Sequence, residues 1–183
     1  MREHRWQQSE TPWHVLVAAT DVGEAGEHMD LVADSDTRAA VARMAGLREL
    51  PRLEADFDLL PQSGGGLRVA GRVSATVGQT CVVTLEPLTN DIEEEIDVLY
   101  MPPAAAPAAD GEAQVAAEPK ADEPEPLIGG AVDLGALATE FLILGLDPYP
   151  RKPGAIFEAP RDNRSEPGPF AGLSALLKNR NGS

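Results

Sequence analysis

Alternation of apolar and polar residues dominates the middle of the sequence and constrains the fold more than any other feature. Apolar residues recur at every second position in four runs, within residues 53–59, 67–77, 81–85 and 92–98. A period of two is typical of strands with one buried and one solvated face. The connections are short and must join antiparallel strands, because parallel strands need long crossovers. The runs therefore predict an antiparallel β meander, either an open sheet or a partial barrel.

Two segments outside these runs predict helices that pack on the meander. The first covers residues 36–45, where Asp34 is suited to cap the start and Gly46 to end it. The second begins after Asp133 and ends near Gly145, and its apolar residues form one continuous stripe across the buried face of the meander. The apolar face of the first helix comprises Ala40, Val41 and Met44, and the stripe of the second comprises Leu134, Leu137, Ala138, Phe141 and Leu142.

The chain divides into an arm, one domain and a tail. Residues 1–12 are polar and predict a flexible N-terminal arm, whereas residues 13–160 predict a single α+β domain. Inside that domain, residues 101–126 hold six prolines, nine alanines and six acids without an apolar pattern, so we expect a long disordered acidic loop. Residues 161–183 form a basic C-terminal tail. Short strands are also predicted at residues 13–19 and 28–33.

The charge balance limits the partners that the chain can bind. Thirty acidic residues outnumber 15 lysines and arginines, which gives a formal net charge of −15. Such a chain repels nucleic acid and anionic lipid at long range, so we expect no DNA partner and no membrane partner. The N-terminus lacks the apolar run of a signal peptide, and no stretch is apolar for long enough to span a membrane. These features predict a cytoplasmic protein.

No pattern in the sequence indicates a catalytic centre, and we expect no enzymatic activity, no cofactor and no metal. The three histidines, His4, His14 and His28, have spacings that match no compact metal site. Cys81 is the single cysteine and lies in a predicted strand without a nearby cation in the sequence. This setting favours a buried, inert thiol over a nucleophile. Binding, not chemistry, is therefore the expected activity.

Two charged clusters are the candidate interaction sites. Glu93, Glu95 and Asp97 share one face of the last predicted strand, because neighbours along a strand point to opposite sides. We interpret them first as a solvated face that protects the sheet and second as an acidic docking surface. The tail is either a frayed terminus or a contact for RNA or for an acidic surface. Its basic residues are Arg161, Arg164, Lys178 and Arg180.

Two segments of the chain resemble a known family. The first is residues 71–87, GRVSATVGQTCVVTLEP, and the second is residues 132–144, VDLGALATEFLIL, followed by DPYP. Their order and spacing, with a variable acidic loop between them, resemble the YceD family of bacterial large ribosomal RNA subunit accumulation proteins, over residues 13–160. Many members of that family carry two cysteines separated by two residues. Here Cys81 matches the first and Thr84 replaces the second, which removes a paired-thiol site.

The resemblance implies a role in the accumulation of large-subunit ribosomal RNA and supplies no catalytic residues. Combined with the acidic charge, it leads to the hypothesis of a non-enzymatic factor in large-subunit biogenesis. That factor would bind a basic ribosomal protein, an assembly factor or 23S rRNA through its acidic strand face and acidic loop. Two alternatives stay open: a self-associating structural module whose sheet edge pairs with another copy, and an enzyme that uses scattered carboxylates. The oligomeric state stays open as well.

Overall fold

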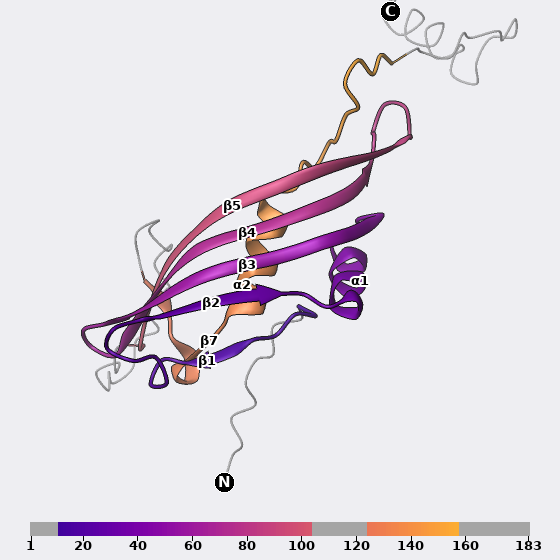
Figure 1. The fold of residues 1–183 in the computed structure, drawn as a ribbon. Helices are drawn as coiled ribbons and strands as arrows, with labels where there is room; N and C mark the ends of the chain where they lie inside the picture. The colour runs from indigo at the N-terminus through magenta and orange to yellow at the C-terminus, as the bar shows by residue number, and fades with distance from the viewer. Residues whose placement is uncertain (1–10, 104–123, 158–183) are drawn as a thin grey trace, which may run out of the picture.

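The computed structural model describes residues 11–103 and 124–157. Its described part is an α+β fold with an open five-stranded sheet, a separate two-stranded sheet and two helices (Figure 1). The predicted fold class is confirmed, and the sheet is open and not a closed barrel. The strands are β1 (Leu16–Ala18), β2 (Glu27–Val32), β3 (Glu49–Gln62), β4 (Gly66–Thr80), β5 (Pro87–Met101), β6 (Glu125–Pro126) and β7 (Ala131–Asp133). The helices are α1 (Ser35–Met44), the short 3-10 helix η1 (Ile128–Gly130) and α2 (Leu134–Leu144).

The predicted meander is confirmed, with three long strands and one shorter one. The strand order in the large sheet is β2-β3-β4-β5-β6, and β2 to β5 pair antiparallel. Only the two-residue β6 pairs parallel, with the end of β5. At the middle of the sheet Gly71 lies opposite Phe57, and a Cβ atom on Gly71 would clash with the carbonyl oxygen of Asp56. Only glycine permits this approach of β3 and β4.

The inner face of the sheet forms the core, and α2 covers it as predicted (Figure 1). Asp133 caps α2 by accepting a hydrogen bond from the amide of Ala136 at 3.1 Å, and Gly145 follows the last turn. Burial of the apolar stripe stabilises a helix that is too short to be stable alone in water. The largest fully buried side chains come from both layers and include Leu53, Phe57, Leu59, Leu67, Val73, Ile96, Leu134 and Leu142.

Helix α1 has the predicted ends but a different buried face. The carboxylate of Asp34 accepts a hydrogen bond from the amide of Thr37 at 2.7 Å, and Gly46 has the positive φ of 67° that favours glycine after a helix. Val41 and Ala42 are buried, whereas Met44 is 42% exposed. The prediction that Met44 belongs to the buried apolar face is wrong, because α1 turns Val41 and Ala42 toward the core and leaves Met44 on its exposed side.

The third alternating run is a turn and not a strand. Strand β4 continues to Thr80, and residues 81–86 then reverse the chain, with a hydrogen bond of 2.9 Å from the amide of Cys81 to the carbonyl of Glu86. Leu85 in this turn has a positive φ of 59°. The turn predicted at residues 87–90 is also wrong, because these residues already belong to β5. The four predicted runs therefore correspond to three strands in the structure.

The remaining predictions concern the ends of the domain and the acidic insertion. The strand predicted at residues 13–19 is only three residues long, β1, and it pairs antiparallel with β7. The insertion predicted at residues 101–126 begins and ends in the sheet, because Met101 closes β5 and residues 125–126 form β6. Its central residues, 104–123, lie outside the described residues, as do most of the N-terminal arm and the whole tail.

Candidate functional site

The outer face of the large sheet is the main candidate site. Because side chains alternate along each strand, the polar set of β2 to β5 points away from α2 and into solvent. Eight carboxylates and three arginines lie on this face, a formal excess of five negative charges. The carboxylates are Asp30, Glu54, Asp56, Asp58, Asp91, Glu93, Glu95 and Asp97, and the arginines are Arg52, Arg68 and Arg72.

The three acids predicted on β5 do share this face, but two of them are paired with arginines of β4. Arg72 Nη1 lies 2.6 Å from Glu93 Oε1, and Arg68 donates two hydrogen bonds to Asp97, at 2.8 and 2.6 Å. The hydrogen bonds from Arg68 hold the pKa of Asp97 below its ordinary value. Glu95 has no ion pair with any described residue. The predicted acidic cluster is therefore an ordered ladder of charges with one uncompensated carboxylate.

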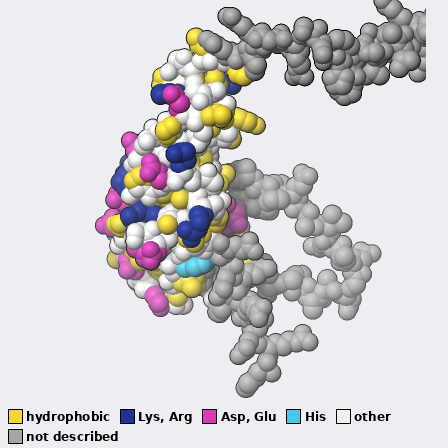
Figure 2. Space-filling view, turned by 90° about the vertical axis from the view of Figure 1, so that its right-hand side faces the viewer, with side chains coloured by type: hydrophobic (Ala, Val, Ile, Leu, Met, Phe, Trp, Pro, Cys, Tyr) yellow, Lys and Arg dark blue, Asp and Glu magenta, His cyan; other side chains and the backbone are white. Residues whose placement is uncertain are grey.

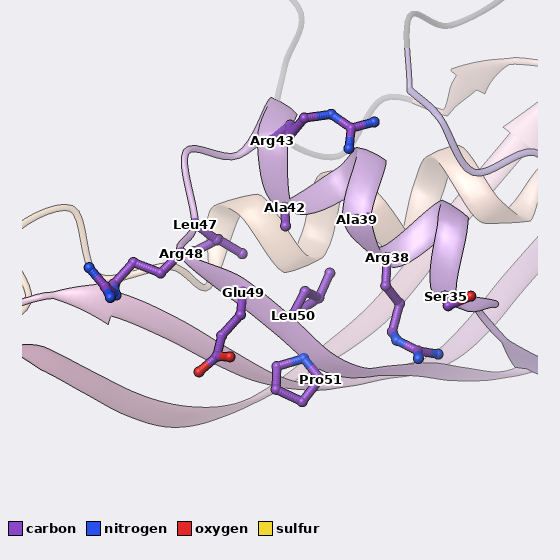
Figure 3. A pocket seen from close by; sticks show the side chains of 10 residues that line it. All are labelled: Ser35, Arg38, Ala39, Ala42, Arg43, Leu47, Arg48, Glu49, Leu50 and Pro51. Atoms are coloured by element: carbon purple, nitrogen blue, oxygen red, sulfur yellow. The ribbon is translucent and has the colours of Figure 1, made fainter.

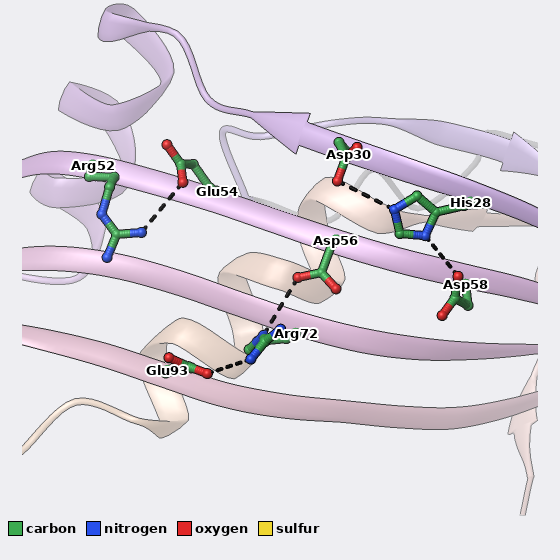
Figure 4. A network of polar contacts seen from close by, with 8 residues as sticks. All are labelled: His28, Asp30, Arg52, Glu54, Asp56, Asp58, Arg72 and Glu93. Atoms are coloured by element: carbon green, nitrogen blue, oxygen red, sulfur yellow. Dashed lines mark hydrogen bonds and ion pairs between the residues drawn. The ribbon is translucent and has the colours of Figure 1, made fainter.

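The ladder continues across the sheet to β2 (Figure 4). Arg72 also lies 3.7 Å from Asp56 on β3, so its guanidinium bridges two strands. On β2, His28 Nδ1 lies 2.7 Å from Asp58, and its Nε2 lies 3.5 Å from Asp30. The hydrogen bond with Asp58 raises the pKa of His28 above its ordinary value. The fixed positions of these side chains give the face a defined pattern of charge.

Shallow hollows on this face are open to solvent. One is lined by residues of β2, β3 and β4, and another by residues of β3, β4 and β5. Figure 2 shows acidic and basic side chains interspersed along one side of the described residues. An open, charged surface of this kind contacts a macromolecule over many groups, whereas small molecules are bound in concave apolar pockets. The lining residues that carry charge are Asp30, Glu54, Asp56, Arg72, Glu95 and Asp97.

The second predicted cluster is not placed by the structure. Arg161, Arg164, Lys178 and Arg180 all lie in the tail, outside the described residues. Their interpretation as a contact for RNA or for an acidic surface stays a prediction. Within the described residues, no helix combines the length and the apolar character that crossing a membrane requires. The described residues also contain no group of three or more histidine, cysteine or acidic side chains that could hold a metal ion.

Cys81 has a setting that the sequence did not reveal. The thiol is buried, as predicted, and its Sγ accepts hydrogen bonds from the backbone amides of Lys152 at 3.3 Å and Thr84 at 3.4 Å. These donors, the Lys152 amide first, lower the pKa of Cys81 to about 6, and the expectation that the thiol is inert stays a prediction. Lys152 lies 71 positions away in the sequence, so no local signal indicated this contact.

The same turn anchors the segment that follows α2. The amide of Val82 donates a hydrogen bond of 2.9 Å to the carbonyl of Pro150, and Gln79 Nε2 donates one of 3.0 Å to the carbonyl of Asp147. Lys152 Nζ lies 2.9 Å from a carboxylate oxygen of Glu86. Cys81 therefore belongs to a set of polar contacts that joins the β4–β5 turn to residues 147–152.

The described residues define a small α+β protein with a charged open sheet face and a helix across the opposite face. The family model of YceD, described as large ribosomal RNA subunit accumulation protein YceD, matches residues 69–177, more than half of the chain. The chain belongs to the YceD family, and the resemblance seen in the sequence is confirmed. No curated protein and no solved structure gave a match. The family description supports a role in the accumulation of large-subunit ribosomal RNA.

The family match differs in extent from the predicted resemblance. It begins at Val69, inside β4, and therefore leaves out β2, β3 and α1. It ends at Leu177 and so includes most of the basic tail, which the resemblance over residues 13–160 did not. The β5 acids and the Cys81 turn lie inside the matched part.

Proposed function

We propose that this protein is a non-enzymatic, cytoplasmic factor in large-subunit biogenesis that binds a basic ribosomal protein or assembly factor through the outer face of its sheet. The observation that supports this proposal most directly is the excess of five negative charges on that face. Cross-strand ion pairs hold several of the charged side chains in fixed positions. The family description supports the link to the large subunit. Ribosomal proteins must be basic to neutralise RNA, so an acidic surface suits them electrostatically.

Glu95 is the centre of this proposal. It is exposed, lies in β5 opposite Arg72 and forms no ion pair with a described residue. A cation from a partner would therefore meet Glu95 without first breaking an ion pair. Glu93 and Asp97 flank it on the same face, and their arginines leave lone pairs of the carboxylates free for further donors. The surface thus offers both an unpaired acid and two acids that can accept a second cation.

The test is affinity purification of the tagged full chain from bacterial cytoplasm at 50 and 500 mM salt, with identification of proteins and RNA. Basic large-subunit proteins or assembly factors should be recovered at low salt and lost at high salt, because exposed charges are screened. Glu95→Lys should reduce this recovery strongly. Glu24→Lys changes the charge equally in the exposed turn that precedes β2, outside the strands of the sheet, and should leave recovery nearly unchanged. Recovery of the bait alone, or equal losses in both variants, would refute the proposal.

Self-association is the second candidate, and β2 is the observation that favours it. Among the described residues, this six-residue strand forms one edge of the large sheet and pairs only with β3. Its charged residues Glu27 and Asp30 oppose pairing with an identical strand, because like charges would come together. Light scattering on the purified chain across a hundredfold range of concentration tests this candidate. A mass that stays at 19.4 kDa eliminates it.

A further inference from the structure

A hollow of about 450 Å³ lies between α1 and the start of β3, outside the charged sheet face (Figure 3). Its floor is apolar, and arginines from the helix and from the loop after it form the rim. Because Val41 and Ala42 of α1 pack into the core beneath the inner face, this groove lies away from the outer face. We call it the α1 groove, and its lining residues are Ser35, Arg38, Ala39, Ala42, Arg43, Leu47, Arg48, Glu49, Leu50 and Pro51.

The rim arginines differ from the arginines of the sheet in their partners. Arg38, Arg43 and Arg48 form no ion pair within 4 Å of a carboxylate of the described residues, whereas all three sheet arginines do. Asp34 lies close enough to Arg38 for the guanidinium to contribute to its lowered pKa, although the amide of Thr37 is the main cause. The positive charge of this rim is therefore largely uncompensated, in a chain whose total charge is −15.

Contacts with the backbone hold the Arg38 side chain and the segment that carries Arg48. Arg38 Nη1 donates a hydrogen bond of 2.5 Å to the carbonyl of Ala33, and the amide of Arg48 donates one of 2.8 Å to the carbonyl of Gly78. Arg43 lies in the last turn of α1. Figure 3 shows the three guanidinium groups pointing in different directions and not at one point. This spacing suits several anionic groups along a chain better than it suits one free phosphate ion.

Glu49 is the one acid that lines the groove, and it does not neutralise the rim. Its side chain points away from α1 toward β4, where its Cγ lies 2.5 Å from the place that a Cβ on Gly78 would occupy. Glu49 forms no ion pair with a described residue. Three arginines and one carboxylate therefore give the lining of the groove a formal charge of +2.

We propose that the α1 groove binds the phosphodiester backbone of single-stranded RNA. The rim arginines would contact successive phosphates, and the apolar floor of Ala39, Leu47 and Leu50 would cover the faces of sugars or bases. At physiological salt the field of the sheet acids is screened within about 8 Å, so a local basic rim can hold phosphates on an acidic chain. This inference rests on the ribosomal part of the proposed function, whose family description names ribosomal RNA.

The experiment measures fluorescence anisotropy of a labelled 20-nucleotide uridine RNA with the full chain between 50 and 200 mM salt. The test variant is the triple Arg38→Gln, Arg43→Gln, Arg48→Gln. Each phosphate contact contributes about 0.7 to the slope of log K against log salt for single strands. Loss of three contacts should make this negative slope shallower by about 2 and should weaken the affinity about 100-fold at 100 mM salt.

The matched control removes the same three charges from the sheet, in the triple Arg52→Gln, Arg68→Gln, Arg72→Gln. This control should retain RNA binding to within about the effect of one contact, because its arginines already pair with carboxylates. Circular dichroism establishes that both triples are folded. Equal losses in the two triples would show a net-charge effect and overturn the proposal, as would a wild-type chain that does not bind the RNA at 50 mM salt.

The outcome separates this inference from the proposed function. If wild-type RNA binding is absent while Glu95→Lys still abolishes capture of basic ribosomal proteins, only the α1 groove proposal fails. If the groove triple loses RNA while Glu95→Lys changes nothing, the docking face fails and the groove stands. Competition with polyglutamate provides a last check, because an acidic peptide that displaces the RNA at equal charge concentration would contradict recognition of the phosphate backbone.

Discussion

Asp133 connects three parts of the fold, and its removal gives the sharpest test of how the domain is held together. Its Oδ1 accepts hydrogen bonds from the amide of Ala136 at 3.1 Å and from the amide of Val15 at 2.9 Å. Its Oδ2 lies 2.6 Å from Nδ1 of His14. The side chain is only 17% exposed. One carboxylate therefore caps α2 and fixes the segment that leads into β1.

The Asp133→Ala variant should lower the free energy of unfolding by about 2–4 kcal/mol. Loss of a helix N-cap costs about 1 kcal/mol. The amide of Val15 would also lose its acceptor in a partly buried setting, which costs about 1–3 kcal/mol. Loss of the contact between Asp133 and the exposed His14 should add little to the loss of unfolding free energy, because surface ion pairs are weak.

Urea unfolding followed by circular dichroism measures this loss, with Asp34→Ala as the matched control. Asp34 caps α1 through the amide of Thr37 and is exposed, so its removal measures the effect of a helix cap without a contact to β1. Asp133→Asn is a second control, because its amide oxygen can still accept the bonds from Ala136 and Val15. We expect Asp133→Ala to be the most destabilised of the three. Equal losses for Asp133→Ala and Asp34→Ala would refute the contribution assigned to the amide of Val15.

Three further predictions follow from single positions. Gly71→Ala should destabilise the sheet by about 1–3 kcal/mol or more, because the added carbon meets the backbone of β3; thermal unfolding measures this against Gly23→Ala, which has open space. The contact of His28 with Asp58 should stabilise the fold fully below a pH of about 6.5, and this stabilisation should be lost as pH rises through the raised pKa of His28. In urea unfolding, the difference in free energy of unfolding between wild type and His28→Gln should therefore be largest at pH 5–6 and almost zero at pH 8. The ultraviolet absorbance of the Cys81 thiolate, which needs no reagent to reach the buried sulfur, should rise with a midpoint at a pH of about 6 in the folded chain and of about 8.5 in urea, and equal midpoints would contradict the assigned hydrogen bonds.

Features set by local sequence were predicted well. The carboxylate of Asp133 and the glycine at position 145 mark the two ends of α2, and both signals depend only on residues within one turn of the helix. The same holds for Asp34 and Gly46 around α1. The alternation in β3 and β4 also identified the buried face, because the period of a strand is local.

Features set by contacts between distant residues were missed. The alternation of Cys81, Val83 and Leu85 predicted a strand at residues 81–85, but the chain reverses direction there between β4 and β5. The misplaced turn would also have shifted the register of β4 and β5, and the pairing of Arg68 with Asp97, 29 positions apart, depends on that register. No local pattern could identify these ion pairs.

The α1 groove was missed for a different reason. Its arginines recur at intervals of five residues, at positions 38, 43 and 48, which matches neither a helix face nor a strand face. They lie on one rim only because the chain turns at Gly46 and returns along α1 into β3. Three arginines within eleven residues of a strongly acidic chain were the one signal that the sequence offered.

The boundary of the family match separates the acids of β5 from the α1 groove and runs through the outer face of the sheet. The match starts inside β4, yet β4 packs against Phe57 and Leu59 of β3, so the matched residues need the earlier strands to bury their inner face. The earlier segment is therefore required to complete the core of the matched part. The acids of β5 lie inside the match and the α1 groove lies outside it. Glu95, the centre of the proposed docking face, therefore lies in the part of the chain that the family model matches, whereas the proposed RNA site lies in the part that it does not match.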